Sequence, residues 1–361
     1  MSGGRPSPRL AAFAATAAAP AVEAGGRSHD KGGRDLIAFT SLDRGEPRAQ
    51  FDANIWVVDP DSHAARPLTS HLADDISPDW APDGKRLAFT SFRSGGGDVW
   101  TVSARGGHER RVTTGPGVDR EPRWSPDGRW IAFVRQSPGG LAGQGAIWIA
   151  RRDGAFAWPV SGCCASRLEW SPDGRRLAFV HRPPHDPFAT HGTITLLRLP
   201  GGPRQALGLG SDPAWSPDGR LVAFSDTRSR VVVARAHGHP KLRTVTPGPG
   251  FDPAWTPDGR RLVYARPTGG DVESQFRRVD LSGHHDVPLT PGPGWSPTGP
   301  GDVDPEVSPD GRRVVFVSTS TEPFGDVALV GIDGSGLGRL VPDDREDVEP
   351  TWRPAPPDHR R

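Results

Sequence analysis

Short apolar runs recur along the chain at nearly even intervals, and a polar turn sequence precedes each of them. The clearest copy, Trp124–Phe133, reads Trp-Ser-Pro-Asp-Gly-Arg-Trp-Ile-Ala-Phe. Related copies occupy Trp80–Phe89, Trp170–Phe179, Trp215–Phe224 and Trp255–Tyr264, and a sixth copy, Val307–Phe316, has Val in place of the first Trp. The leading positions lie between 40 residues (Trp215 to Trp255) and 52 residues (Trp255 to Val307) apart. This period is typical of four-stranded propeller blades.

Each repeat predicts four short strands. The first ends at the Trp, and Ser-Pro-Asp-Gly then forms a tight turn, because Pro presets φ and Asp and Gly tolerate the turn conformations that follow. The second strand is the apolar run, such as Leu87–Phe89. Third strands are expected at Asp98–Val102, Ala146–Ala150, Thr193–Leu197, Val231–Ala234, Phe276–Val279 and Asp326–Val330. Weaker outer strands end near Thr113, Thr246 and Thr290.

The two ends of the chain carry complementary parts of one more repeat. Leu36–Thr40 and Asn54–Val58 read as second and third strands without a Trp strand before them, and Asp347–Trp352 is a Trp strand with nothing after it. Pairing them protects sheet edges that would otherwise stay open. The sequence therefore predicts an all-β fold, a single β-propeller of seven four-stranded blades closed by its N- and C-terminal strands. Six blades with two loose half-units is the alternative.

Composition limits the classes of partner. The 361 residues carry a net charge of +1, and no basic stripe with interleaved aromatic residues is present, so we expect no nucleic-acid partner. No segment approaches the length of about 18 uncharged apolar residues that a membrane span requires. Although 46 glycines and 40 prolines are present, they fall at turns between periodic strands, which is typical of many short strands.

The termini differ from the repeats. Arg5 and Arg9 precede the Ala-rich run Leu10–Val22, and small residues around Ala24 fit a signal peptidase site. We expect residues 1–33 to be a signal peptide or a disordered leader, residues 34–354 to form the propeller and residues 355–361 to be a disordered tail. The expected location is the periplasm or the exterior, with the cytoplasm as the alternative.

The only two cysteines, Cys163 and Cys164, are adjacent in a connector. Neighbours in sequence can pair only through a strained ring, so two reduced thiols are expected. A vicinal disulfide is the alternative if the protein is exported.

The Pro-x-Trp-Ser-Pro-Asp-Gly-x-x-Leu-Ala-Phe phrase resembles the repeat of the TolB-like (PD40) propellers. This resemblance spans nearly all of the chain beyond residue 34. It implies a bacterial protein, often periplasmic or secreted, that works as a binding platform. TolB itself carries a separate N-terminal domain and is usually six-bladed, whereas this chain has only about 30 low-complexity residues before its first strand and seven predicted blades. The resemblance is therefore carried over for the fold and the binding role.

The same repeat is similar to the propeller of prolyl oligopeptidase-type enzymes, in which an α/β-hydrolase domain performs the chemistry. That domain needs a Gly-x-Ser-x-Gly elbow. The nearest match, Gly294–Thr298, lacks the final Gly. We therefore expect no serine peptidase activity and, more generally, no enzyme.

Acidic residues gather near the start of the first strands. Five positions before the Trp or its equivalent, four repeats carry an acid and three a small residue: Asp75, Asp119, Asp302 and Asp347 against Ala165, Gly210 and Gly250. Three positions before it stand Ser77, Glu121, Arg167, Asp212, Asp252, Asp304 and Glu349. Because positions two apart on a strand share a face, one channel mouth should be rich in carboxylates.

Two interpretations of this acidic mouth remain open. It could bind a basic or amine-bearing ligand, or a divalent cation such as calcium, which takes carboxylate and carbonyl oxygens. Alternatively, each acid could bond backbone amides at a strand start. We expect no cofactor otherwise. The site candidates are Asp75, Asp119, Asp302, Asp347, Glu121, Asp304, Glu349 and Arg167.

Histidines and one loop supply weaker candidates. His181, His185 and His191 share a loop, but their spacing is not that of a dense zinc site. Trp295, in the insert Gly292–Asp302, is a candidate partner contact. The sequence thus favours a non-enzymatic, exported, monomeric propeller that binds an unidentified protein or peptide. The alternative is a metal-dependent lyase or hydrolase acting on a sugar or small ester at the channel mouth.

Overall fold

The computed structural model describes residues 35–43, 52–140, 145–183, 186, 191–268, 274–291, 305–318, 325–341 and 345–355. The chain divides into two compact units, Met1–Gly33 and Arg34–Arg361, and every described residue lies in the second. The predicted leader, the predicted tail beyond Ala355, and the candidates Asp302, Asp304, Trp295 and His185 lie outside the described residues.

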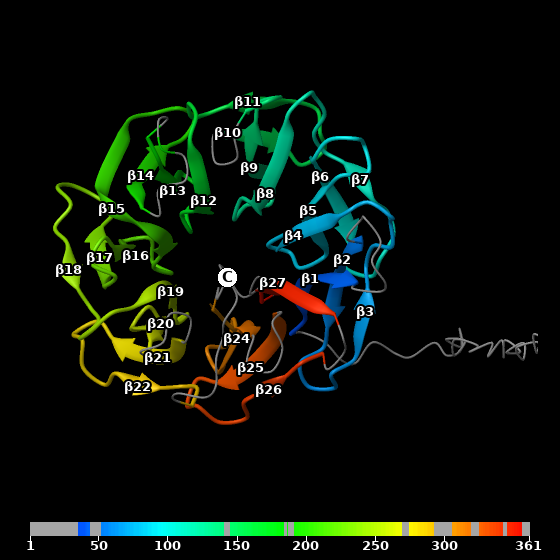
Figure 1. The fold of residues 1–361 in the computed structure, drawn as a ribbon. Coiled ribbons are helices and arrows are strands. Elements are labelled where there is room, and N and C mark those ends of the chain that lie inside the picture. The colour runs from blue at the N-terminus through cyan, green and yellow to red at the C-terminus, as the bar shows by residue number, and fades with distance from the viewer. Residues whose placement is uncertain are drawn as a thin grey trace, which may run out of the picture. The chain divides into compact units, whose positions relative to one another are not determined.

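The described part of the chain is all-β, and its sheets are antiparallel. Figure 1 shows them arranged around a common centre, with β4, β8, β12, β19 and β27 among the strands nearest to it. No helix long and apolar enough to cross a membrane occurs among the described residues. Two four-stranded sheets are β4 (Asp75–Trp80), β5 (Arg86–Ser91), β6 (Asp98–Ser103) and β7 (Arg110–Arg111), and β8 (Val118–Trp124), β9 (Trp130–Gln136), β10 (Ala146–Arg151) and β11 (Ala157–Pro159).

A seven-stranded sheet follows, in which one long strand, β15, joins two successive repeats. Its strands are β12 (Ala165–Trp170), β13 (Arg176–His181), β14 (Gly192–Arg198), β15 (Arg204–Trp215), β16 (Leu221–Asp226), β17 (Val231–Arg235) and β18 (Arg243–Thr244). The next two sheets are β19 (Phe251–Trp255), β20 (Arg261–Pro267), β21 (Ser274–Asp280) and β22 (Val287–Pro288), and β23 (Glu306–Val307), β24 (Arg313–Ser318), β25 (Asp326–Gly331) and β26 (Gly338–Arg339).

Strands from the two ends of the chain share one sheet. It contains β27 (Glu346–Trp352), β1 (Ile37–Asp43), β2 (Asp52–Val58) and β3 (Ala65–Pro67), in that order. β1 and β27 run antiparallel, with Ile37 opposite Trp352 and Ser41 opposite Asp347. The predicted second and third strands near the N-terminus and the Trp strand near the C-terminus therefore lie side by side.

The aromatic residues of the repeat hold the sheets together. The aromatic ring that ends each apolar run is fully buried, as at Phe89, Phe133 and Phe224. Four of the Trp indoles donate a hydrogen bond to the carbonyl that immediately precedes the Trp position of the previous repeat: Trp80 to Thr351 (3.2 Å), Trp170 to Arg123 (3.0 Å), Trp255 to Ala214 (3.0 Å) and Trp352 to Glu306 (3.0 Å). The repeated Trp is thus a contact between sheets.

The Ser-Pro-Asp-Gly turns form as predicted. In the turn after Trp124, the Ser125 hydroxyl donates to Asp127 Oδ1 (2.6 Å), which also accepts from the Arg129 N–H (3.0 Å). Gly128 has a φ of 65°, a left-handed conformation that glycine adopts without a steric penalty. The Asp residues of these turns are therefore structural.

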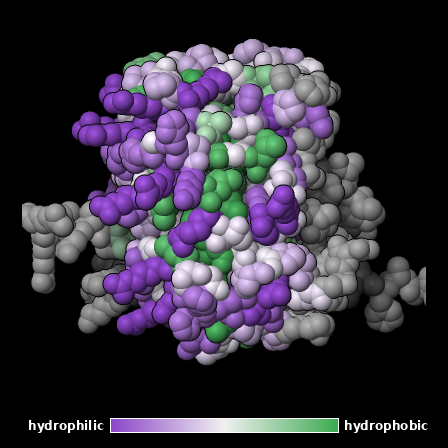
Figure 2. All heavy atoms as spheres, turned by 90° about the vertical axis from the view of Figure 1, so that its left-hand side faces the viewer, coloured by the Kyte–Doolittle hydropathy of each residue, from purple (hydrophilic) through white to green (hydrophobic). Residues whose placement is uncertain are grey.

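The outer surface is mixed in character. Figure 2 shows the side that carries β15, β17 and β18, where apolar surface lies in the middle and hydrophilic side chains lie to either side. Leu209 of β15 and Leu242, just before β18, are 60% and 45% exposed. Exposed leucines on a protein surface are common singly, so they assign no partner here.

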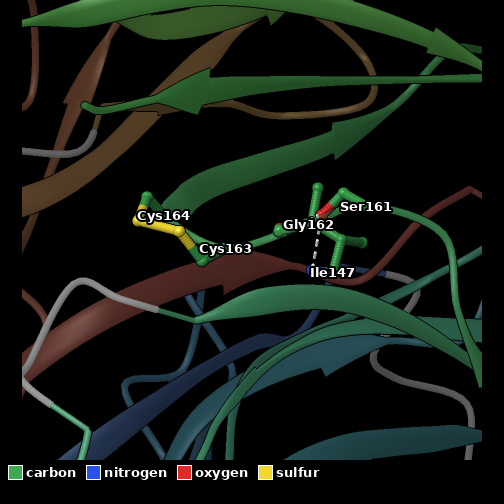
Figure 3. The surroundings of a disulfide bond; sticks show 5 residues. All are labelled: Ile147, Ser161, Gly162, Cys163 and Cys164. Carbon is green, nitrogen blue, oxygen red and sulfur yellow. Dashed lines mark hydrogen bonds between the residues drawn. A yellow bond between two sulfur atoms is a disulfide. The ribbon is translucent and has the colours of Figure 1, made fainter. Parts of the chain in front are cut away.

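Cys163 and Cys164 form a vicinal disulfide, so the expectation of two reduced thiols is wrong (Figure 3). Cys164 is buried and has a φ of 74°, whereas Cys163 is exposed. The preceding loop is anchored where the Ile147 N–H donates to Ser161 Oγ (2.8 Å), and the Cys164 carbonyl accepts from the Arg182 N–H (2.8 Å). The left-handed Cys164 turns the chain directly into β12.

Candidate functional site: an acid-lined channel

The innermost strands enclose a cavity of about 630 Å³, which we call the channel. Two sets of positions supply most of its charged lining. The residues three before the Trp position, the −3 set, are Ser77, Glu121, Arg167, Asp212, Asp252 and Glu349. The residues one before it, the −1 set, are Asp79, Arg123, Glu169, Ala214, Ala254, Glu306 and Thr351. The lining therefore contains seven carboxylates and two guanidinium groups.

In the part of the chain that the structure describes, a bulge in six of the first strands turns their −3 side chains into the channel. All six −3 residues have a positive φ, between 49° and 57°. The pairing register with the second strand shifts at the same place, for example between Ile76 and Asp79 and between Arg120 and Arg123. Such a conformation is costly for residues other than glycine, and a bulge is where it is accommodated. Its recurrence in every described −3 residue marks it as part of the repeat.

The bulge separates two acidic sets that were expected to share a face. Asp75, Asp119 and Asp347, five before the Trp and here called the −5 acids, are at most 1% exposed and do not line the channel. Asp119 accepts two bonds of 2.6 Å from Arg135 of β9, and Asp75 accepts one of 2.7 Å from Arg93. Strict alternation, on which the expectation rested, fails because the bulge inserts an extra residue between the two positions.

Close backbone packing explains two of the repeats that lack an acid at the −5 position. A Cβ added at Gly210 would lie 2.2 Å from the Ser225 carbonyl oxygen, and one added at Gly250 would lie 2.5 Å from the Tyr264 ring. No side chain fits in either place. Packing therefore accounts for two of the three repeats that lack an acid, and the third, Ala165, is not explained in this way.

Two −3 carboxylates connect neighbouring repeats. Glu349 accepts from the Ser77 N–H (2.7 Å), the Ser77 hydroxyl (2.9 Å) and the Thr40 hydroxyl (2.9 Å). Glu121 accepts from the Arg167 N–H (3.1 Å). In both pairs the donor is the left-handed residue of the next repeat, whose N–H the bulge has removed from the sheet. Arg167 in turn lies 3.6 Å from Asp212.

The −1 acids also connect neighbouring repeats, by accepting the N–H of the Trp in the next repeat. Asp79 accepts from the Trp124 N–H (2.6 Å), Glu169 from the Trp215 N–H (2.9 Å) and Glu306 from the Trp352 N–H (3.2 Å). This set was not predicted from the sequence. The signal was present, since a charged residue stands directly before the Trp position in four repeats, as Asp79, Arg123, Glu169 and Glu306.

Burial raises the pKa of all three −1 acids. The pKa of Asp79 rises to about 6, and the pKa values of Glu169 and Glu306 rise to about 8. The nearby charge of Arg123 lowers the pKa of each, but by less than burial raises it. At neutral pH the arrangement holds Glu169 and Glu306 mostly protonated, while an ionised Asp79 balances Arg123.

The described residues bring no group of three or more His, Cys, Asp or Glu side chains together as metal ligands. His181, at the end of β13, has its pKa lowered by burial and by Arg204, and it does not line the channel. In the channel lining, oxygen acceptors held in fixed positions outnumber the cations. Such a lining can bind the ammonium or guanidinium group of a ligand.

Structures of known proteins show the same fold at low identity. TolB from Acinetobacter baumannii matches with a TM-score of 0.55 at 16% identity, covering 88% of this chain and 83% of that one. A puromycin-hydrolyzing peptidase of Mycobacterium tuberculosis matches at 0.64 and 16%, covering 86% of this chain but only 52% of that one. An oligogalacturonate lyase from Vibrio parahaemolyticus matches at 0.59 and 12%, covering 85% of each.

No curated protein matches the chain. The solved structures include a TolB, a peptidase and a lyase, so the shared fold does not assign an activity. The family comparison is more specific: residues 32–156 match the model of the PD40 family, described as the TolB beta propeller domain.

Proposed function

We propose that this protein is a non-enzymatic binding propeller of TolB-like type, with seven blades, that holds a basic segment of a partner protein or peptide in its channel. The seven-stranded sheet counts as two blades that share β15, since it contains two Trp-ended strands, β12 and β15. With five four-stranded sheets, this makes seven. The pairing of β1 with β27 supports a ring closed by the chain ends.

The observation that carries the proposal is the acidity of the channel lining, seven carboxyl groups against two arginines, so that acids outnumber cations even with Glu169 and Glu306 protonated. Glu121 and Glu349 of the −3 set and the three −1 acids already bond backbone N–H groups between repeats, which holds them in place before a ligand arrives. Asp212 of β15 and Asp252 of β19 add two further −3 carboxylates to the same wall. A rigid site of this kind loses little conformational entropy on binding.

The proposal includes a location outside the cytoplasm, in the periplasm or the exterior. The Cys163–Cys164 disulfide supports it, because disulfides persist in oxidising compartments and are rare in the cytosol. No observation on the described residues favours the metal-dependent enzyme over the binding protein.

The test measures binding of a fluorescein-labelled peptide of alternating lysine and glycine to the full chain by fluorescence anisotropy. The channel variant is Asp212→Asn/Asp252→Asn. We expect it to weaken binding by about thirtyfold, because each of the two lost charge-assisted bonds contributes on the order of 1 kcal/mol.

The matched control is Asp258→Asn/Asp310→Asn, which removes the same charge at two turns outside the channel. It should change affinity by less than about twofold. Equal losses in both variants would show that only net charge attracts the peptide. Failure of the unaltered protein to bind at millimolar peptide would also reject the channel as a site for basic segments.

A further inference from the structure

A second hollow lies between the sheets β4–β7 and β8–β11, and we call it the groove. Its volume is about 850 Å³, within the range of about 300–1,000 Å³ that ligand sites occupy. It is separate from the channel, and no residue lines both. The lining comprises Ala81, Pro82, Asp83, Arg86, Thr101, Arg110, Trp124, Asp127, Gly128, Arg129, Trp130, Arg151, Arg152, Asp153 and Phe156.

Aromatic rings form an apolar wall of the groove. Trp130 at the start of β9 packs edge-on against Trp158 of β11, with ring centroids 5.2 Å apart. Phe156 contacts both rings, at 5.8 Å from Trp130 and 5.5 Å from Trp158. Phe156 nevertheless remains 50% exposed. Half of a large aromatic side chain is therefore available to a partner at the edge of a charged hollow.

Arginines outnumber acids around the groove, five to three. Arg151 pairs with Asp153 (2.9 Å), and Arg129 lies 4.0 Å from Asp127. Arg110 donates to the Asp153 carbonyl. Among the described residues, the exposed guanidinium groups of Arg86 and Arg152 have no hydrogen-bond or ion-pair partner.

Comparison between repeats shows which groove residues have counterparts elsewhere in the fold and which occur only in this groove. Arg110 has counterparts elsewhere: Arg66 donates to the Ala104 carbonyl (2.7 Å) and Arg278 to the Ile332 carbonyl (2.7 Å), in the same way. A contact that recurs between sheets serves the fold. Arg110 is therefore not evidence for a ligand.

Arg152 departs from its counterparts. Its backbone N–H donates to the Arg129 carbonyl (3.1 Å), and the equivalent bond in other repeats comes from an apolar residue. These residues are Ala104, Leu199, Ala236 and Ile332. An exposed, unpaired arginine at a position that is otherwise apolar is not required by the repeat.

Trp130 departs as well. The residue two after the turn Gly is Arg86, Arg176, Arg261 or Arg313 in four other repeats and Leu221 in a fifth. Trp130 and Arg152 thus bring two features that the compared repeats lack to one groove, beside the exposed ring of Phe156. Purely structural demands would have produced them in every copy.

We propose that the groove binds an acidic peptide segment that carries an aromatic residue. The carboxylates of the segment pair with Arg86 and Arg152, and its ring packs on Phe156 and Trp130. Charge complementarity selects an acidic partner, because the unpaired groups of the groove are all guanidinium. The exposed ring of Phe156 and the adjoining ring of Trp130 favour a ligand that carries an aromatic residue over one that is only charged.

The experiment titrates the full chain with a fluorescein-labelled hexapeptide of glutamates with one central phenylalanine. Two single variants restore residues that the other repeats carry, Arg152→Ala and Trp130→Leu, so both should fold. Each is expected to weaken binding about five- to tenfold, as loss of a charge pair or a ring contact does. The control Arg235→Ala removes an exposed arginine from β17 and should leave affinity unchanged.

Two changes to the peptide test its recognition. Replacing the phenylalanine by alanine should weaken binding several-fold, and replacing the glutamates by glutamines, which are neutral and are ligands of neither site, should abolish it. The proposal is overturned if the unaltered protein does not bind at millimolar peptide, if Arg152→Ala and Arg235→Ala behave alike, or if the alanine peptide binds as well as the phenylalanine peptide. Far-ultraviolet circular dichroism of each variant confirms the fold.

Discussion

Two sets of carboxylates occupy positions only four residues apart in the repeat, and their surroundings differ. Asp75 and Asp119, at the −5 position, each bond an arginine of their own repeat at 2.6–2.7 Å. Asp79, Glu169 and Glu306, at the −1 position, each bond a backbone N–H of the next repeat, and one arginine, Arg123, serves all three. One set is neutralised by pairing and the other mainly by protonation.

This difference shows how the same residue type takes two roles in one repeat. A carboxylate with a dedicated guanidinium group can stay ionised when buried, because the pair offsets the loss of hydration. A carboxylate that shares one cation with two others is compensated less, and burial raises the pKa of Glu169 and Glu306 to about 8. Burial also raises the pKa of Asp75 and Asp119, but each has its own arginine to oppose that effect. The −5 acids are therefore fixed parts of the fold, whereas the −1 acids can change charge with pH at the wall of the proposed binding site.

The largest effect is expected from Asp119→Ala. It leaves the Arg135 guanidinium, only 16% exposed and lying over the rings of Phe133 and Trp148, without its carboxylate. Breaking a buried pair on one side typically costs about 3 kcal/mol. Urea unfolding should show a loss of that size.

A double-mutant cycle isolates the pair. Arg135→Leu keeps an apolar contact with the two rings, so the double variant Asp119→Ala/Arg135→Leu should recover much of the lost stability. A single-variant loss below about 1 kcal/mol would mean that the −5 acids are not structural pairs, and the contrast with the −1 acids would no longer hold.

An intermediate effect is expected from pH. Because the folded-state pKa values of Glu169 and Glu306 lie near 8, above the ordinary 4.5, the folded protein binds more protons than the unfolded chain between those values. Stability is then fully present below pH 4.5 and falls as pH rises towards 8. Since both side chains keep partial exposure, we expect about 2 kcal/mol for the pair, measured by urea unfolding between about pH 5 and 8.

The variant Glu169→Gln/Glu306→Gln should flatten this dependence, because a glutamine oxygen still accepts the Trp N–H but does not titrate. Glu109→Gln, at an exposed glutamate, should leave the slope as it is. If the double variant kept the full slope, the titrating groups would have to lie elsewhere, and the −1 acids would be ionised like the −5 acids.

The fold was predictable because its determinants are local and repeated. The turn at Ser125–Gly128, the apolar run ending at Phe133 and the complementary strands at the two ends all follow from residue type and spacing. The fold family then follows from the period. Contacts between distant residues do not have to be known for any of these steps.

The site was only partly predictable. The structure places Glu121, Arg167 and Glu349 in the channel lining, but it places Asp75, Asp119 and Asp347 behind it. The bulge that divides them leaves no glycine at the left-handed position, so the sequence carries no plain signal of it. Which acid pairs with Arg135 and which faces a backbone N–H depends on the third dimension.

The smallest effect is expected from the turn residue Asp218, a third kind of acid in the repeat. The pKa of Asp218 is lowered, whereas the pKa of Glu169 is raised, so the two acids should change stability with pH in opposite directions. The hydrogen bond from the Ser216 hydroxyl (2.7 Å), followed by that from the Arg220 N–H (3.0 Å), lowers its pKa. A lowered folded-state pKa stabilises the protein above the ordinary value of 3.8 and ceases to do so as pH falls below it. Asp218→Ala should cost about 0.5–1 kcal/mol at about pH 6 in urea unfolding, and less at about pH 3, because the side chain is exposed and its bonds compete with water. Ser216→Ala should reproduce part of the loss. If the loss of stability in Asp218→Ala grew as pH fell, this exposed acid would behave as Glu169 is expected to. Differences in environment would then fail to distinguish the carboxylates of the repeat.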